Sequence, residues 1–266
     1  RLDLRCSPQG LRLASSPLRW SGWRGQLQGE LPLVGARSNQ LQLKLQARER
    51  KEGHRFSAAL AGPLAQLQLQ LDGQLASVAL AKQPPQPLAF QAQVLLRNQA
   101  GLRAELKRLL LRQGGGELAA SGQLWPNLQI RSQSLRLGPR QQQAWGPVLG
   151  LRPDLQLVLK QLGPWSKPQL SLELEQQRNP LLGSVRSQLI WRPSLLRLER
   201  FESPYLTAQG PLPLGRTPMG LEIDLRRFPL ERLSALLGTE LRGQLSASGA
   251  LRGSLQRLRP DLTLQA

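Results

Sequence analysis

The sequence is poor in the residues on which most catalytic and metal sites depend. Its 266 residues include one cysteine, Cys6, and one histidine, His54. A single cysteine excludes a disulfide within the chain, and two such residues are too few for a zinc site, which uses about four nitrogen or sulfur ligands. Because His54 lies in the charged stretch ERKEGHRF, we interpret it as a solvated loop residue and not as a catalytic base. The sequence therefore predicts no enzyme, no catalytic residue, no metal site and no cofactor.

Aromatic residues and long apolar segments are also scarce. Aromatics make up 4% of the chain, whereas leucine accounts for roughly one residue in four, far above ordinary usage. Aromatic side chains supply much of the buried area of compact cores, so a dense globular core is not favoured. The apolar runs are far shorter than the roughly 20 residues of a helical membrane span, and the sequence predicts no such helix.

Acidic residues are outnumbered by basic ones. Lysine and arginine total 36 against 17 acidic residues, which leaves a net charge of +19. This balance fits a nucleic acid, an anionic membrane surface or an acidic protein as partner, or simply a solvated basic surface. Single-strand nucleic-acid binders interleave basic residues with stacking aromatics, whereas here the arginines are dispersed and the tryptophans lie mostly near turns or prolines. We expect no nucleic-acid partner and keep a basic nucleic-acid-binding domain as the alternative.

Leucine alternates with polar residues in many short segments. In LAQLQLQLDGQL, at 64–75, every second residue from Leu67 to Leu71 is leucine and its neighbours are mostly glutamine. Successive side chains of a strand point to opposite faces, so such a segment predicts a strand with one leucine face and one polar face. The leucines that this alternation places on one face of their strands are Leu41, Leu43, Leu45, Leu67, Leu69, Leu71, Leu155, Leu157, Leu159, Leu170, Leu172, Leu174, Leu262 and Leu264.

Glycine and proline separate these segments. Gly-Pro pairs are strong turn signals, and the stretch QPPQP at 83–87 predicts a loop, with a sub-boundary of the chain expected near 82–88. A Gly-x-Leu unit also recurs at irregular spacing, which favours an array of short strands over a single closed globule. The chain opens at Arg1, without methionine, in the middle of an alternating pattern. We therefore interpret residues 1–266 as a piece of a longer protein.

Two segments have helical features. A short helix is predicted near 229–237, where Pro229 would fall in the first turn and Gly238 would form the C-cap. The segment GLRAELKRLLLRQGGG, at 101–116, fits either a short basic helix or two strands around a bend.

The C-terminal stretch at 228–266 resembles the TamB family of envelope proteins, which belongs to the AsmA-like group. Three patterns carry the resemblance: P-L-x-x-L-x-x-L-L-G at 229–238, L-x-G-x-L-x-x-x-G-x-L-x-G-S-L at 241–255, and P-x-L-x-L at 260–264. The leucine- and arginine-rich composition is similar to the cyanobacterial branch of this family. Related phrases upstream are WRGQLQGELPL at 23–33, LAGPLAQLQLQLDG at 60–73 and FESPYLTAQGPLPL at 201–214.

The resemblance implies both a fold and a function. The expected fold is mainly all-β: an elongated, curled antiparallel sheet that forms an open hydrophobic groove, the repeating β-groove or β-taco, with one or two short helices. The implied protein spans the periplasm and is anchored in the inner membrane through a segment outside this sequence. It would move phospholipid between the inner and outer membranes, or assist outer-membrane protein assembly and secretion.

The implied partners are phospholipid acyl chains and an outer-membrane assembly protein of the Omp85 type. The fourteen leucines named above would line the lipid groove, and the alternate polar residues would face water. The remaining alternative is an ordinary β-sandwich interaction domain in which the leucines form a core, although such strands usually contain more valine, isoleucine and aromatic residues.

Overall fold

Strands make up nearly all of the regular structure in the computed structural model. The chain divides into two compact units, Arg1–Gln133 (unit 1) and Ser134–Ala266 (unit 2). The described residues of both units form antiparallel strands with a single short helix, so the predicted all-β class is confirmed. The structure describes residues 4–7, 10–32, 40–78, 86–98, 101–138, 155–164, 166–212, 218–254 and 257–265.

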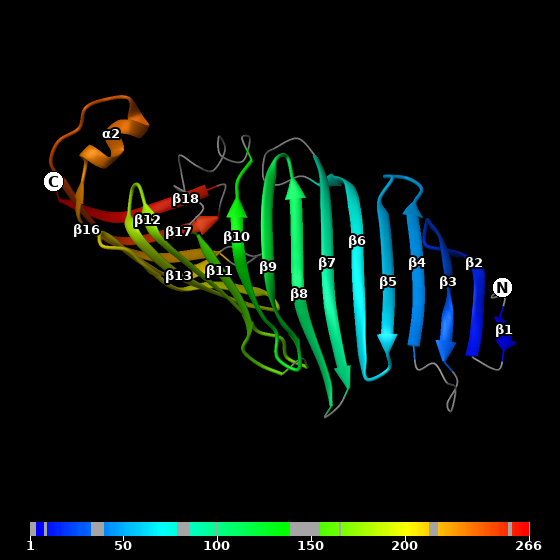
Figure 1. The fold of residues 1–266 in the computed structure, drawn as a ribbon. Helices are drawn as coiled ribbons and strands as arrows, with labels where there is room; N and C mark the ends of the chain where they lie inside the picture. Colours follow the sequence, from blue (N-terminus) through cyan, green and yellow to red (C-terminus); the bar gives the residue numbers. More distant parts are fainter. Residues whose placement is uncertain are drawn as a thin grey trace. The chain divides into compact units, whose positions relative to one another are not determined.

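Unit 1 is built as a meander, in which each strand pairs with the next one along the chain (Figure 1). The segment at 101–116, which fitted either a short helix or two strands around a bend, forms the single strand β8 and the turn that leads into β9. The strands of this meander are β1 (Leu4–Ser7), β2 (Gly10–Trp20), β3 (Trp23–Pro32), β4 (Gln40–Glu49), β5 (Arg55–Pro63), β6 (Gln66–Val78), β7 (Gln86–Asn98), β8 (Leu102–Gln113) and β9 (Gly116–Trp125), followed by β10 (Gln129–Arg136) across the division between the units.

Two-residue turns fix the register of two hairpins in unit 1. Between β2 and β3, Ser21 and Gly22 have φ angles of 38° and 87°, and between β8 and β9, Gly114 and Gly115 have φ angles of 54° and 82°. Positive φ at both central residues is typical of the type I′ turn, whose twist matches that of the flanking strands. The first of these turns places Trp20 opposite Trp23, and this pairing sets the partner of every residue further along the hairpin.

Unit 2 repeats the meander order. Each strand from β11 onward pairs antiparallel with its successor. The elements are β11 (Gln156–Gln161), β12 (Leu170–Asn179), β13 (Gly183–Arg192), β14 (Leu195–Glu202), β15 (Leu206–Leu212), β16 (Met219–Pro229), α2 (Glu231–Leu237), β17 (Gln244–Ser254) and β18 (Arg257–Gln265).

Helix α2 lies where the sequence predicted a short helix. Gly238 ends it with φ 66°, and its N–H donates to the Ser234 carbonyl, as expected for a glycine C-cap. Pro229 does not occupy the first helical turn, however, because it is the last residue of β16 and lies opposite Gln244. The helix is therefore shorter at its start than the sequence predicted.

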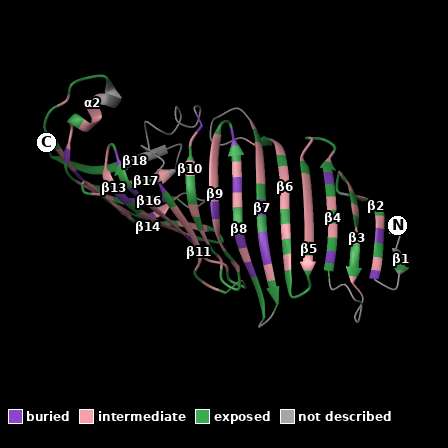
Figure 2. Cartoon of the chain, viewed as in Figure 1, coloured by how far each residue is buried: buried purple, intermediate pink, exposed green. Residues whose placement is uncertain are grey.

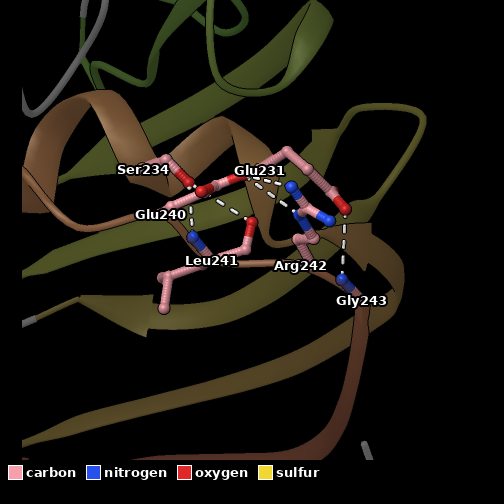
Figure 3. A network of polar contacts seen from close by, with 6 residues as sticks. All are labelled: Glu231, Ser234, Glu240, Leu241, Arg242 and Gly243. Carbon is pink, nitrogen blue, oxygen red and sulfur yellow. Dashed lines mark hydrogen bonds and ion pairs between the residues drawn. The ribbon is translucent and has the colours of Figure 1, made fainter.

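A polar network joins α2 to the chain that follows it (Figure 3). The Leu241 N–H donates to the Ser234 hydroxyl at 2.9 Å, and the Gly243 N–H donates to the Glu231 carboxylate at 3.1 Å. Hydrogen bonds from the main-chain N–H groups of Glu231 itself and of Gly243 to this carboxylate lower the pKa of Glu231. Arg242 forms an ion pair with Glu240 at 2.6 Å.

The expected curling of the sheet into a groove is not observed in the described strands, which form an open sheet that is not strongly curled. Alternation in the sequence assigns side chains to faces but does not set curvature, which depends on twist and on bulges. One bulge lies in β8, where Val94 is opposite Leu106 but Gln93 is opposite Arg108, so Lys107 is the extra residue.

The division between the units does not fall in the predicted loop. Strands β6 and β7 pair with each other along most of their length, so the strands on either side of the expected sub-boundary near 82–88 belong to the same unit. Residues 83–85 of the predicted loop lie outside the described residues, whereas Gln86 and Pro87 are the first residues of β7 and not part of a loop.

Candidate functional site

One face of unit 1 carries apolar side chains in aligned rows. The register sets Leu43, Leu60, Leu69, Val94 and Leu106 opposite one another on successive strands from β4 to β8. Directly opposite residues share a face and lie about 5 Å apart, so this row is a continuous apolar strip across the sheet. We call the surface formed by this row and its neighbours the leucine face of unit 1. The next row on this face contains Leu27, Leu45, Ala58, Leu71, Ala92, Leu109 and Ala120.

Burial on this face is graded. Val94 and Leu106 are 7% and 4% exposed and form the centre of a small cluster, whereas Leu69 and Leu71 are only half-buried at its margin. Figure 2 shows buried segments along β7 and β8. The main contacts between described elements join strands that are neighbours in the sheet. No second layer of described strands therefore packs on this face, and many of its leucines stay partly accessible.

Glycines on the leucine face leave room for larger neighbours. A Cβ added at Gly73 would lie 2.3 Å from a ring atom of Phe90, its cross-strand partner. Gly29 is equally confined, because a Cβ there would lie 2.1 Å from the Gln42 carbonyl oxygen. Some glycines of the recurring Gly-x-Leu unit thus share the face with the leucine two residues later and are needed for close packing.

Unit 2 also has an apolar face. Leu159, Leu172, Leu189 and Leu198 lie opposite one another on β11 to β14. The same face contains a buried cluster of Leu198, Met219 and Leu221. We call this surface the leucine face of unit 2.

The leucines predicted to line a groove lie partly on the leucine face of unit 1 and partly on that of unit 2. Leu41 is 6% exposed and Leu43, Leu45, Leu67, Leu69 and Leu71 are half-buried in unit 1. In unit 2, Leu155, just before β11, is 4% exposed, and Leu157, Leu159, Leu170, Leu172 and Leu174 are half-buried. Leu262 and Leu264 on β18 are more open, at 37% and 65% exposed. The placement on one face agrees with the alternation, and the role of these residues in binding lipid stays a prediction.

The opposite face of unit 2 is polar, and several of its charges are paired. Lys160 contacts Glu173 at 2.8 Å, and Arg186 contacts Glu175 at 3.2 Å. A hydrogen bond from the Arg200 guanidinium lowers the pKa of Glu202, and the two side chains are 61% and 41% exposed. Exposed pairs of this kind contribute little to stability, but they leave a face with opposite charges placed side by side.

His54 is not the solvated residue that the sequence predicted. Its side chain is 17% exposed, Nδ1 accepts a hydrogen bond from the Ala76 N–H at 2.9 Å, and Nε2 lies 2.6 Å from the Glu52 carboxylate. The ring also lies 6.5 Å from that of Trp23. His54 directly precedes β5, and its ring reaches the main chain of the neighbouring strand β6. The local charge pattern could not show this, and both ring nitrogens of His54 serve structural contacts.

Glu49, Glu52 and His54 bring potential metal-ligating atoms within 4.8 Å of one another. Glu49, however, accepts the N–H groups of Lys51 and Glu52. We therefore interpret these three side chains as stabilising the β4–β5 turn through hydrogen bonds to its main chain and the Glu52–His54 contact.

A row of arginines on the polar face of unit 1 was missed by the sequence analysis. Arg19, Arg24, Arg48 and Arg55 lie opposite one another on β2 to β5. One signal for it was present, because RWSGWR at 19–24 is symmetric about the two-residue turn. A type I′ turn at Ser21-Gly22 would have predicted Arg19 opposite Arg24.

Comparisons with known proteins add no further identification, since no protein-family model, no curated protein and no solved structure matches the chain. None of the described residues belongs to a helix with the length and apolar character needed to cross a bilayer.

Proposed function

We propose that the leucine faces bind phospholipid acyl chains and that the protein transports phospholipid as part of a TamB-like, repeating β-groove assembly. One observation carries this proposal: leucine-rich rows stay in register across five strands, β4 to β8, in a sheet whose described residues form one layer. A sheet with one apolar face ordinarily buries that face against another element, and large exposed apolar patches mark interaction sites.

An acyl chain is a suitable occupant because it requires apolar area and no directed hydrogen bonds. Each methylene group that leaves water contributes about 0.8 kcal/mol. The rows run from strand to strand, so a bound chain would meet similar leucine and alanine side chains at successive positions. Its free energy would then change little as it moves along the sheet.

The finer features of the proposal rest on the resemblance to the TamB family. They are the curling of the sheet into a groove, the location in the periplasm with an inner-membrane anchor, the role in outer-membrane protein assembly, and a partner of the Omp85 type. The absence of catalysis belongs to the same proposal. The open sheet is consistent with an apolar binding surface. To form a groove, the sheet would need to curve further or to continue with additional strands.

Native mass spectrometry of the purified chain tests lipid binding. We expect co-purified phospholipid in the natural sequence and its loss in a Leu69→Arg/Leu157→Arg variant, which places a charge on the leucine face of each unit. The matched control is Gln70→Arg/Gln156→Arg, because these exposed residues adjoin the two leucines on the same strands but point to the opposite face.

Retention of lipid by the control and loss by the leucine variant would support the proposal. Equal lipid content in all three proteins would show that these faces do not hold acyl chains. A salt-sensitive shift of a labelled oligonucleotide, with no lipid in any preparation, would instead favour the nucleic-acid alternative.

A further inference from the structure

The arginine row of unit 1 aligns four like charges on the polar face. Like-charged pairs elsewhere on this face are isolated, as at Arg97 and Arg103, and some directly opposite residues combine opposite charges. Arg12 contacts Glu30 at 3.5 Å and Arg112 contacts Glu117 at 2.9 Å. By contrast, the register aligns four guanidinium-bearing side chains on neighbouring strands: Arg19, Arg24, Arg48 and Arg55. Like charges directly opposite each other destabilise a sheet, so a bound anion would relieve the repulsion within the row.

No carboxylate among the described residues compensates the row. All four arginines are exposed, and none of them forms an ion pair within the described part of the chain. The adjacent turn supplies Glu49 and Glu52, but their carboxylates accept main-chain N–H groups and contact His54. The row is therefore left with its positive charge available to a partner.

The arginines form one wall of an open cleft of about 750 Å³. The other wall is a parallel row that includes Gln26, Gln46 and Ser57 and ends at Asp72. Residues between the two rows have no side chain, as at Gly25 and Gly73, or point to the leucine face, so the floor of the cleft is main chain. Guanidinium donors thus face amide and hydroxyl groups across a shallow channel.

The dimensions and chemistry of this cleft fit phosphate groups. Neighbouring strands lie about 4.8 Å apart, so the four arginines span about 14 Å. A phosphate monoester has a charge of about −1.5 to −2 and three acceptor oxygens, so two such groups balance the row. Arginine binds phosphate oxygens through two parallel N–H donors, and all four basic residues of the row are arginine and none is lysine.

Two other anionic partners fit less well. A single-stranded nucleic acid uses aromatic side chains as stacking platforms, but Trp23 and Phe56 occupy positions that alternate with the arginines and so point to the other face. An acidic peptide would need four carboxylates to match the charge, and Asp72 at one end of the cleft would repel its extension.

We propose that the cleft lined by Arg19, Arg24, Arg48 and Arg55 binds a compact ligand with at least two phosphate groups, either a multiply phosphorylated lipid headgroup or a soluble polyphosphate. The ligand lies along the arginine row with its phosphates between successive guanidinium groups, and the glutamine and serine side chains of the other wall contact its remaining polar atoms. This site is on the polar face, so it does not depend on lipid tails binding to the leucine face.

Isothermal titration calorimetry with inorganic tripolyphosphate in low salt tests the site. The variant is Arg24→Gln/Arg48→Gln, which removes the two central charges. The matched control is Arg97→Gln/Arg103→Gln, because these exposed arginines are directly opposite each other on β7 and β8, share the polar face and lie outside the cleft. We expect the cleft variant to raise the Kd for tripolyphosphate at least tenfold and the control to raise it less than twofold.

Vesicle binding then distinguishes the two sources of phosphate. Phosphatidylcholine vesicles containing a phosphatidylinositol bisphosphate, whose headgroup carries two phosphate monoesters, are compared with phosphatidylglycerol vesicles of equal total charge. Preference for the bisphosphate lipid that is lost in the cleft variant assigns the site to a lipid headgroup, and tripolyphosphate binding with no such preference assigns it to a soluble ligand.

Two results would overturn the proposal. If the cleft variant and the control weaken tripolyphosphate binding equally, binding would depend on the overall charge of the protein and not on the cleft. Binding of oligothymidylate that depends on Arg24 and Arg48, with no binding of tripolyphosphate by the natural sequence, would assign the cleft to a nucleic acid.

Discussion

Replacing Arg24 and Arg48 with glutamine should stabilise strands β2 to β5 of unit 1. The double substitution removes all three directly opposite arginine pairs of the row, Arg19–Arg24, Arg24–Arg48 and Arg48–Arg55. Two unit charges about 5 Å apart in water repel by about 0.8 kcal/mol, so the three pairs total about 2.5 kcal/mol before screening. Salt at 0.1 M, with a Debye length of about 10 Å, and spreading of the exposed side chains reduce the expected gain to about 1–2 kcal/mol, within the range for cross-strand charge pairs.

Hydrogen exchange measured by mass spectrometry is the appropriate assay, since it reports the opening free energy of each strand separately. Amides of β2 to β5 should become more protected in the variant, and the gain should shrink by more than half at 1 M salt, where the Debye length is about 3 Å. The Arg97→Gln/Arg103→Gln control removes one opposite pair and should stabilise β7 and β8 by about one third as much.

Lower protection of β2 to β5 in the variant would refute this reasoning, because the arginines would then be making contacts that hold the sheet together. A gain that is the same at low and high salt would also refute it, because repulsion between exposed charges must be screened. The combination of higher stability with lost tripolyphosphate binding would show that the row is retained for its ligand at a cost to the fold.

Three further predictions concern the leucine face and helix α2. Gly73→Ala should destabilise unit 1 by about 1–3 kcal/mol through the clash with Phe90, and a second change, Phe90→Leu, should recover part of the loss in urea denaturation. Leu106→Ala should cost about 2–5 kcal/mol in the same assay because its side chain is 4% exposed, whereas Leu71→Ala should cost clearly less because Leu71 is half-buried. The folded-state pKa of Glu231 is lowered by main-chain hydrogen bonds, so Glu231 stabilises α2 above the ordinary glutamate pKa of about 4.3. The advantage over Glu231→Gln in thermal unfolding should therefore fall as pH drops below about 4.3, and an advantage that persists at pH 2 would contradict the assignment.

Much of the architecture followed from the period-two pattern. Leu67, Leu69 and Leu71 predicted both the strand and its apolar face, and β6 has that form. The pattern failed where side chains on both faces are apolar or basic. In β8, the run from Leu106 to Leu111 fits a helix as well as a strand, and the bulge at Lys107 shifts the alternation in its middle. The sequence of one strand does not reveal a bulge, because a bulge is defined by how the strand pairs with its partner.

The arginine row and the position of His54 could not follow from local patterns. Arg24 and Arg48 are distant in sequence and become neighbours only when the β3–β4 register is known. The His54 side chain is only 17% exposed and its ring accepts a hydrogen bond from the Ala76 N–H of β6, a contact that depends on the β5–β6 register. Composition predicted a basic protein, but it could not distinguish dispersed charge from four arginines in line.

The meander order has a consequence for how such a sheet grows and changes. Since each strand pairs with the adjoining segment of chain, a hairpin can join the sheet as soon as it has been synthesised. Insertion or deletion of one complete hairpin would leave the connections of all the others unchanged. The number of strands in each unit could therefore vary in evolution by gene-level duplication of short segments, without any rearrangement of the existing topology.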